Sequence, residues 1–266
     1  MNNPHKEVVD QIYKIGEMNF DYLELTIEYP AATPDKLMQK KGKILDAISS
    51  YNLGLLAHLP WFFSLANPYE RIQNATNKEI ENAMHIANLF GARLITIHPD
   101  LVTPVSVQGR KLMLDHTIKN LDYLNKQAKK FGLELCLETV DEKALNIDEY
   151  KKILSSLDIS ITLDIGHLST YFSVDLEDFI KTFKDKIAHI HLHDFKGLED
   201  HLPLGAGRLD LDKAVSTLKN FYNKTITLEV HANDPYYLVY SKEALELSWY
   251  GKKVVEENKK YYGIKD

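Results

Sequence analysis

Short apolar runs alternate with longer amphipathic segments along the whole chain. The runs are rich in Ile, Leu and Val, which is typical of parallel strands buried on both faces. They predict seven strands, at residues 22–28, 53–59, 94–98, 133–140, 159–165, 187–193 and 225–231. Between the runs, apolar residues recur at helical spacing, as with Ile80, Met84 and Ala87. This spacing predicts helices at 5–17, 34–51, 70–90, 108–131, 147–156, 175–185, 210–221 and 241–261.

Strict alternation of strands and helices predicts a parallel sheet with right-handed crossovers. For 266 residues we therefore expect an α/β fold, a TIM-type (β/α) barrel that forms one domain over residues 1–266. A doubly wound sheet is the alternative, but it usually carries a Gly-rich phosphate loop after its first strand, which this sequence lacks. An eighth strand would have to precede Val8, where MNNPHK is a poor strand. The expected barrel lacks that first strand and is open or seven-stranded there.

Composition narrows the class of protein. The chain is 44% hydrophobic and 26% charged, with a net charge of −6, which argues against non-specific binding to a polyanion. The single cysteine, Cys136, lies inside an apolar run, so an intrachain disulfide is excluded and core packing is expected. The apolar runs fall short of the roughly 20 residues of a membrane span, and the N-terminus does not resemble a signal peptide. We expect a cytoplasmic protein without a membrane partner.

Six of the runs end in a side chain that can bind a metal. The residues are His58, His98, Glu138, Asp164, His191 and Glu229. Each alone has an ordinary explanation, as a core histidine or a solvated carboxylate. The carboxyl ends of parallel strands converge on one face, however, so the repetition predicts a divalent-metal site. Imidazole and carboxylate suit Zn²⁺, Mn²⁺, Co²⁺ or Fe²⁺, and the missing thiolates exclude a zinc-finger site.

Further candidates lie in the loops. His167 follows Asp164 by three residues, and Glu199, Asp200 and His201 follow the sixth strand. The LGAG run before Arg208 is either a plain turn or a close-approach loop for a phosphate or sugar, with Arg208 as its cation. Trp61, in a run of three aromatic residues, either packs on the next helix or walls a substrate site.

The motifs AHLP, IHPD, LET, LDIGH, HIHLHD, DHLPLGAG and LEVH span residues 58 to 231. At these motifs the chain resembles the xylose isomerase-like TIM-barrel superfamily. That superfamily contains isomerases and epimerases of sugars and sugar phosphates, together with abasic-site nucleases of the endonuclease IV type. The resemblance is specific for the superfamily and poorly specific for the reaction.

The resemblance implies two different metal sites. In the isomerases one divalent metal is held at the positions of Glu138, Asp164, His191 and Glu229, and the two glutamates form the acid–base pair. In the nucleases three zinc ions share a larger set. It adds His58 and His98 at the first ion, with Glu138 bridging to the second, and His167, Glu199 and His201 at the third. The nucleases have Asp in place of Glu199, and Asp200 is an alternative one residue away.

Two enzyme activities therefore stay open. The preferred one is metal-dependent isomerisation or epimerisation of a small sugar or sugar phosphate, with one to three Zn or Mn ions. The runner-up is hydrolysis of phosphodiesters, including abasic-site DNA, by a multinuclear zinc centre. The acidic Asp141 and Glu142 after the fourth strand argue against a nucleic-acid partner. A third possibility is a protein that binds a metal ion but catalyses no reaction. The sequence is also compatible with a homo-oligomer.

Overall fold

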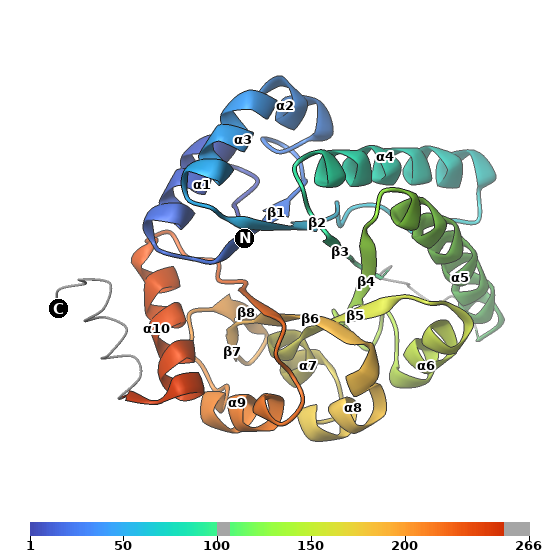
Figure 1. Cartoon of the computed structure of the whole chain (residues 1–266). Helices are drawn as coiled ribbons and strands as arrows, with labels where there is room; N and C mark the ends of the chain where they lie inside the picture. Colours follow the sequence, from blue (N-terminus) through green and yellow to red (C-terminus); the bar gives the residue numbers. More distant parts are fainter. Residues whose placement is uncertain (100–106, 253–266) are drawn as a thin grey trace. The chain divides into compact units, whose positions relative to one another are not determined.

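The computed structural model describes residues 1–99 and 107–252 (Figure 1). The chain divides into two compact units. Among the described residues, the first unit comprises 1–99, 107–163 and 186–188, and the second comprises 164–185 and 189–252. Each unit is described by itself.

The first unit alternates helices and strands in chain order. Its elements are α1 (Val8–Glu17), β1 (Tyr22–Thr26), α2 (Pro34–Gln39), α3 (Lys41–Ser50), β2 (Gly54–His58), α4 (Glu70–Leu89), β3 (Leu94–Ile97), α5 (Val107–Lys130), β4 (Glu134–Glu138), α6 (Ile147–Ser156) and β5 (Ser160–Asp164), whose last residue is assigned to the second unit. Neighbouring strands pair in parallel, with Leu25 opposite Ala57 and Leu137 opposite Ile161. On the outside of the sheet α4 packs against α5 (Figure 1). Cys136 is buried against Leu94 and Ala188, as predicted.

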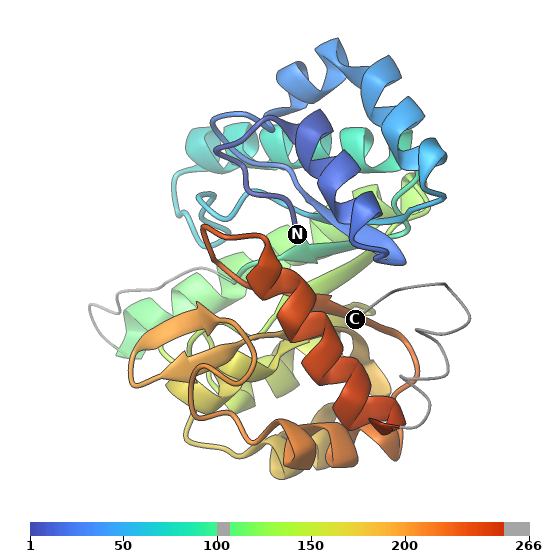
Figure 2. The ribbon, with the colours of Figure 1, turned by 90° about the vertical axis from the view of Figure 1, so that its left-hand side faces the viewer.

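The second unit contains most of β6 (Ile187–Leu192), which pairs in parallel with β9 (Thr225–Leu228). An antiparallel hairpin of β7 (Asp194–Lys196) and β8 (Glu199–Leu202) follows β6. The helices are α7 (Ile165–Tyr171), α8 (Leu176–Phe183), α9 (Leu211–Lys219) and α10 (Tyr236–Tyr250), with a 3-10 turn at Lys184–Lys186. In Figure 2 the C-terminal helix α10 packs against α9.

The strand order is β1-β2-β3-β4-β5-β6-β9, which is the order of the chain once the β7–β8 hairpin is set aside. This order of seven parallel strands, with helices between them, confirms the predicted TIM-type (β/α) fold and the predicted number of strands. None of the described helices is long and apolar enough to cross a membrane.

Three predictions about elements were wrong in detail. The expected helix at 34–51 is two helices, because the backbone at Lys40 (φ −106°, ψ 10°) leaves helical geometry. The short helix α7 and the β7–β8 hairpin were not predicted, because seven helical residues and two strands of three and four residues are too short to show a period. The last helix begins earlier than predicted, at Tyr236, and the predicted end lies outside the described residues.

The N-terminal segment takes part in the edge of β1 without forming a strand. The buried Asn2 carboxamide donates a hydrogen bond to the Thr26 carbonyl (3.3 Å) and accepts one from the Thr26 N–H (2.7 Å). A single side chain therefore makes the pair of bonds that a neighbouring peptide would make, and it satisfies backbone groups that would otherwise be buried without partners. Asn2 thus bonds to the main chain of β1 at Thr26, in a region of the chain where the sequence predicts no strand before β1.

Candidate metal centre

In the first unit, three predicted ligands come together at the carboxyl ends of adjacent strands. His58 ends β2, His98 follows β3 and Glu138 ends β4. The Glu138 Oε2 atom lies 3.1 Å from His58 Nε2 and 2.9 Å from His98 Nε2. His58 and Glu138 are buried, whereas the side chain of His98 is 21% exposed. Two ligands bound to one ion at about 2.1 Å each lie about 3.0 to 3.4 Å apart, so these separations suit a shared ion.

The hydrogen bond of His58 Nδ1 bears on the contact between His58 Nε2 and the Glu138 carboxylate. His58 Nδ1 is 2.9 Å from the Leu59 carbonyl oxygen, which can only accept, so Nδ1 carries the proton. In the neutral imidazole the Nε2 lone pair then faces the carboxylate oxygen at 3.1 Å. Two lone pairs repel each other at this distance unless a cation, either a proton or a metal ion, lies between them. The donor set of the first unit is therefore built around a positive charge.

Tyr150 supports the main chain of Glu138 at the end of β4. Its hydroxyl donates to the Glu138 carbonyl oxygen at 2.6 Å, and both residues are fully buried. Burial and the nearby Glu138 charge raise the pKa of Tyr150 well above its ordinary value, so the phenol stays a donor. Tyr150 thus holds the end of β4 in place.

In the second unit, Asp164 at the end of β5, His191 in β6 and Glu229 after β9 form a second set. His191 Nδ1 lies 2.9 Å from Glu229 Oε2 and 4.0 Å from Asp164 Oδ2. Glu229 Oε2 is buried and accepts no hydrogen bond from the described residues, so its close approach to His191 is not hydrogen-bonded. Burial alone would raise the pKa of Glu229, but His191 and His201 hold it well below the ordinary value. An ionised, buried oxygen of this kind fits a metal ligand.

His189, which shares a strand face with His191, has a different role. Its Nδ1 and Nε2 atoms lie 2.7 Å and 3.0 Å from the hydroxyls of Thr225 and Thr227 on β9. Both ring nitrogens are therefore engaged by the neighbouring strand. His189 ties β6 to β9 and is not available as a ligand.

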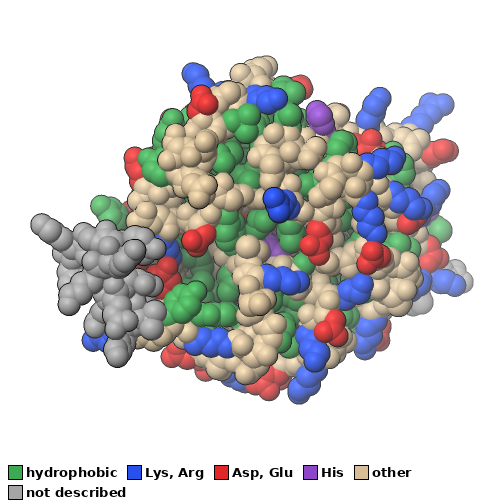
Figure 3. Space-filling view, in the orientation of Figure 1, with side chains coloured by type: hydrophobic (Ala, Val, Ile, Leu, Met, Phe, Trp, Pro, Cys, Tyr) green, Lys and Arg blue, Asp and Glu red, His purple; other side chains and the backbone are tan. Residues whose placement is uncertain are grey.

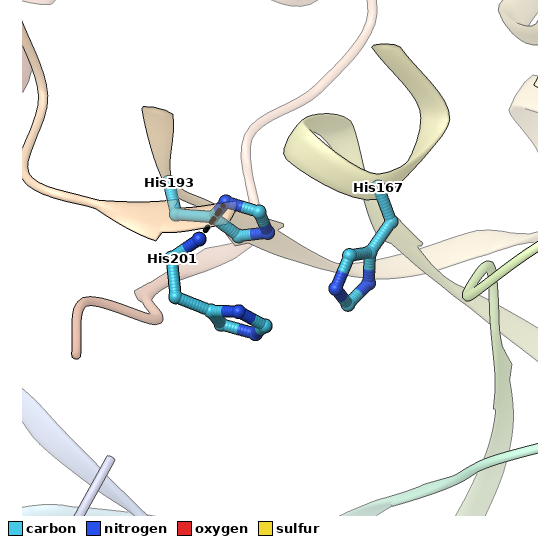
Figure 4. Close-up of side chains that lie close together, drawn as sticks. All are labelled: His167, His193 and His201. Atoms are coloured by element: carbon cyan, nitrogen blue, oxygen red, sulfur yellow. Dashed lines mark hydrogen bonds between the residues drawn. The ribbon is translucent and has the colours of Figure 1, made fainter. Parts of the chain in front are cut away.

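His167 of α7 and His201 of β8 also lie close together, with ring centroids 5.0 Å apart (Figure 4). His201 Nδ1 is 2.8 Å from Asp200 Oδ1, and the other oxygen of Asp200 accepts from the Tyr171 hydroxyl at 2.6 Å. Burial opposes protonation of His201, yet Asp200 and Glu229 raise its pKa to about 10. The hydrogen bond from His201 likewise lowers the pKa of Asp200. Asp200 orients the ring so that Nε2 lies 3.6 Å from Glu229 Oε1.

Glu199 does not join this cluster. It is exposed at the start of β8, whereas Asp200 contacts His201 and lies 3.8 Å from His167 Nε2. Successive strand residues point to opposite faces, but the positive φ of His201 (54°) interrupts that alternation. Asp200 and His201 can therefore both turn toward His167. The structure therefore places Asp200, and not Glu199, beside His201 and His167, and the expected use of Glu199 as a ligand stays a prediction.

The LGAG run is a structural turn. The buried Asp194 carboxylate accepts hydrogen bonds from the N–H groups of Phe195, Gly205, Gly207 and Leu209, at 2.7 to 3.0 Å. A Cβ on Gly207 would lie 2.4 Å from Asp194 Oδ1, so a side chain is excluded there. These N–H groups are engaged by Asp194, which favours the plain-turn interpretation over a phosphate loop. Arg208 is exposed beside the turn.

Trp61 lies on the surface of the first unit. It is 51% exposed, and its main-chain N–H donates to the Glu28 carboxylate at 3.0 Å. Its ring packs on that of Phe62, with the ring centroids 4.1 Å apart. A cavity of about 450 Å³ lies beside this loop, and Phe62, Phe63 and Met38 are among its lining residues. Both interpretations of the aromatic run stay predictions.

Sequence reasoning missed the contribution of His231. It follows Glu229 by two residues, and its ring stacks on that of His201 with centroids 4.2 Å apart and an interplanar angle of 8°. One ligand atom each from His201, Glu229 and His231 lies within reach of a common ion. The LEVH motif already contained this signal, because its last histidine follows a predicted ligand at strand spacing.

Comparisons with known proteins identify the family and agree with the fold. A family model described as xylose isomerase-like TIM barrel matches residues 12–248. An uncharacterized protein of Methanocaldococcus jannaschii is 30% identical over 180 residues, covering 66% of this chain and 70% of the relative. A D-tagatose 3-epimerase-like protein has a TM-score of 0.81 at 23% identity, covering 95% and 96% of the two chains. The IOLI protein with a bound zinc atom has a TM-score of 0.72 at 18% identity, covering 96% and 94%.

Proposed function

Because the chain belongs to the xylose isomerase-like TIM-barrel family, we propose that it is a divalent-metal-dependent isomerase or epimerase of a small sugar or sugar phosphate. Several structures of the same fold are named as sugar 3-epimerases, and another is named with a bound zinc atom. The observation that supports the metal dependence is that Glu138 Oε2 lies 3.1 Å from His58 Nε2 and 2.9 Å from His98 Nε2, separations that suit ligands of a shared ion.

The donor sets fit Zn or Mn. His58, His98 and Glu138 would hold an ion in the first unit, and Asp164, His191 and Glu229 in the second. When bound, such an ion polarises a carbonyl oxygen and stabilises the negative charge that forms when the neighbouring carbon loses its proton. The mixture of imidazole and carboxylate accommodates both metals, since neither donor is strongly selective between them.

The two glutamates are the proposed proton carriers. Glu229 is held ionised by His191 and His201, so it starts as a base, and its Oε1 atom lies 3.6 Å from His201 Nε2. Glu138 is buried and has one oxygen facing two imidazoles. In an epimerisation one carboxylate removes the proton next to the carbonyl and the other returns a proton to the opposite face of that carbon.

Metal-dependent phosphodiester hydrolysis is the second candidate. It is favoured by His167 and His201, because imidazoles beyond the two proposed donor sets would allow a further ion, as in a multinuclear hydrolase. Against it stands the net charge of −6. Figure 3 shows acidic and basic side chains interspersed over one face of the molecule, which is a poor surface for a polyanionic backbone.

The deciding experiment follows proton transfer directly. The protein, loaded with Mn²⁺, Co²⁺ or Zn²⁺, would be incubated in D₂O with ketopentoses, ketohexoses and their phosphates. We expect deuterium to appear by NMR at the carbon next to the carbonyl, and Glu229→Gln to abolish it. The matched control is Glu199→Gln, at an exposed glutamate of the same unit. Cleavage of an abasic-site duplex without any deuterium exchange would replace this proposal with the hydrolase.

A further inference from the structure

The ring of His193 occupies the space that a side chain at residue 166 would fill, and residue 166 is a glycine. His193 follows β6, is fully buried and lies directly against Gly166, the glycine of the LDIGH motif. A Cβ at residue 166 would come within 2.2 Å of the ring Cε1 and 2.4 Å of Nδ1. No flexible side-chain end can give way there, because the obstacle is a packed aromatic ring. Gly166 is therefore needed for the position of His193.

Backbone contacts settle where the His193 proton lies. The N–H of His201 points at His193 Nδ1 at 2.9 Å (Figure 4). That nitrogen must then present its lone pair, and the proton of the neutral ring is on Nε2. The Asp194 carbonyl oxygen, 3.1 Å from the same Nδ1, would require the opposite tautomer. That tautomer would set two N–H groups against each other, so the bond from His201 prevails.

The Nε2 atom of His193 lies 3.1 Å from Asp164 Oδ1, at ion-pair distance but not in ideal hydrogen-bond alignment. The same oxygen accepts a hydrogen bond from the His167 main-chain N–H at 2.7 Å. This bond caps the N-terminus of α7. The hydrogen bond from His167 and the close approach of His193 Nε2 both fall on Oδ1, so together they restrict the rotation of the carboxylate. The other oxygen, Oδ2, is directed toward His167 Nδ1 at 3.2 Å and His191 Nδ1 at 4.0 Å.

We propose that His193 is a positioning residue that holds the Asp164 carboxylate in its metal-binding orientation and couples it to the β7–β8 hairpin through the His201 main chain. This inference rests on the proposed function for the metal at Asp164. The competing role is that of a ligand, because one ring nitrogen each of His167, His193 and His201 lies within reach of a common ion. The proton on Nε2 opposes that role, since the nitrogen that faces the cluster has no lone pair to give.

The first test does not depend on metal or activity. Two-dimensional ¹H–¹⁵N NMR of the metal-free protein distinguishes the two imidazole tautomers, with His193→Gln identifying the resonance. We expect the proton on Nε2. A proton on Nδ1 would overturn the assignment, whether or not the protein proves to be an isomerase.

The second test measures Co²⁺ affinity and visible absorption. His193→Ala and Gly166→Ala should each weaken binding about 10- to 100-fold, with the number of ions and the absorption intensity unchanged. His193→Gln should restore most of the affinity, because its amide N–H replaces the Nε2 proton and an amide is a poor metal ligand. His189→Gln, two residues earlier in β6, is the matched control for a buried histidine. Thermal unfolding of each variant confirms that it folds.

A loss of one ion in His193→Ala, with no rescue by His193→Gln, would show that His193 is a ligand. If the wild-type protein binds no Co²⁺, the proposed function fails, and the tautomer measurement still decides the geometry of His193.

Discussion

The two units assemble metal-binding side chains by different means. In the first, His58 and His98 come from adjacent strand ends and meet one oxygen of Glu138, with Leu59 bonded to the His58 ring and Tyr150 to the Glu138 main chain. In the second, the strand-end residues lie among residues of α7 and β8 that bond to one another, so that Tyr171, Asp200 and His201 form one hydrogen-bonded chain. The comparison indicates that strand ends alone can bring three candidate ligands together, whereas the larger set of the second unit also depends on α7 and the β7–β8 hairpin.

The difference has a physical origin in backbone restraint. A strand end is fixed by its ladder of hydrogen bonds, so a ligand on it needs little further support. The β7–β8 hairpin has a short ladder, and Asp194 holds the turn that follows it by binding the N–H groups of Gly205, Gly207 and Leu209. Loss of a supporting residue should therefore cost more in the second unit than in the first.

The largest effect is expected from Glu229→Gln. Removal of the carboxylate takes away a ligand and a proton carrier together, so turnover should fall by at least about 10³-fold, given that general acid–base catalysis alone contributes about 10² to 10⁴. The measurement is the rate of deuterium exchange at saturating metal. Near-normal exchange would remove Glu229 from the chemistry and leave it a structural residue.

His58→Ala separates the two sets. The loss of one imidazole should weaken the first-unit site by more than about 100-fold, since even a supporting residue is worth about 10 to 100. Metal content by inductively coupled plasma mass spectrometry should fall only by the ion that the first unit holds. His85→Ala, an exposed histidine of the same unit, is the control. If both variants keep every ion, the first-unit set does not bind metal.

Asp200→Asn and Glu199→Gln sharpen the comparison within the hairpin. The first change removes the negative charge and leaves one acceptor oxygen where His201 and Tyr171 now use two, so Co²⁺ affinity should fall by about 10- to 100-fold. The second alters an exposed carboxylate and should leave the affinity unchanged. The reverse ranking would restore Glu199 as the ligand and contradict the observed geometry.

Tyr150→Phe tests how little support the first unit needs. The variant leaves the buried Glu138 carbonyl without its hydroxyl donor, which should cost about 1 to 3 kcal/mol in the free energy of unfolding. Metal affinity should change less than in Asp200→Asn. Urea denaturation and Co²⁺ titration of the same sample give both quantities, and an affinity loss as large as that of Asp200→Asn would abolish the contrast between the units.

The apolar pattern was sufficient for the fold because it repeats. Seven buried runs separated by amphipathic segments have few arrangements other than a parallel sheet with crossover helices. The strand-end candidates of the first unit followed from the same rule, since carboxyl ends of adjacent parallel strands lie side by side. His58, His98 and Glu138 are together in the structure. The short elements α7, β7 and β8 escaped prediction because they contain too few residues to show a period.

The sequence by itself determined which residue types stand at the strand ends, and hence the chemistry on offer. Only the tertiary structure decided which atoms face each other. The choice of Asp200 over Glu199 depends on one positive φ at His201, which no composition or spacing encodes. The role proposed for His193 depends on a backbone N–H that reaches it from eight residues further along the chain. Hydrogen bonds of this kind depend on the path of the folded backbone, and that path is set by the packing of the whole unit.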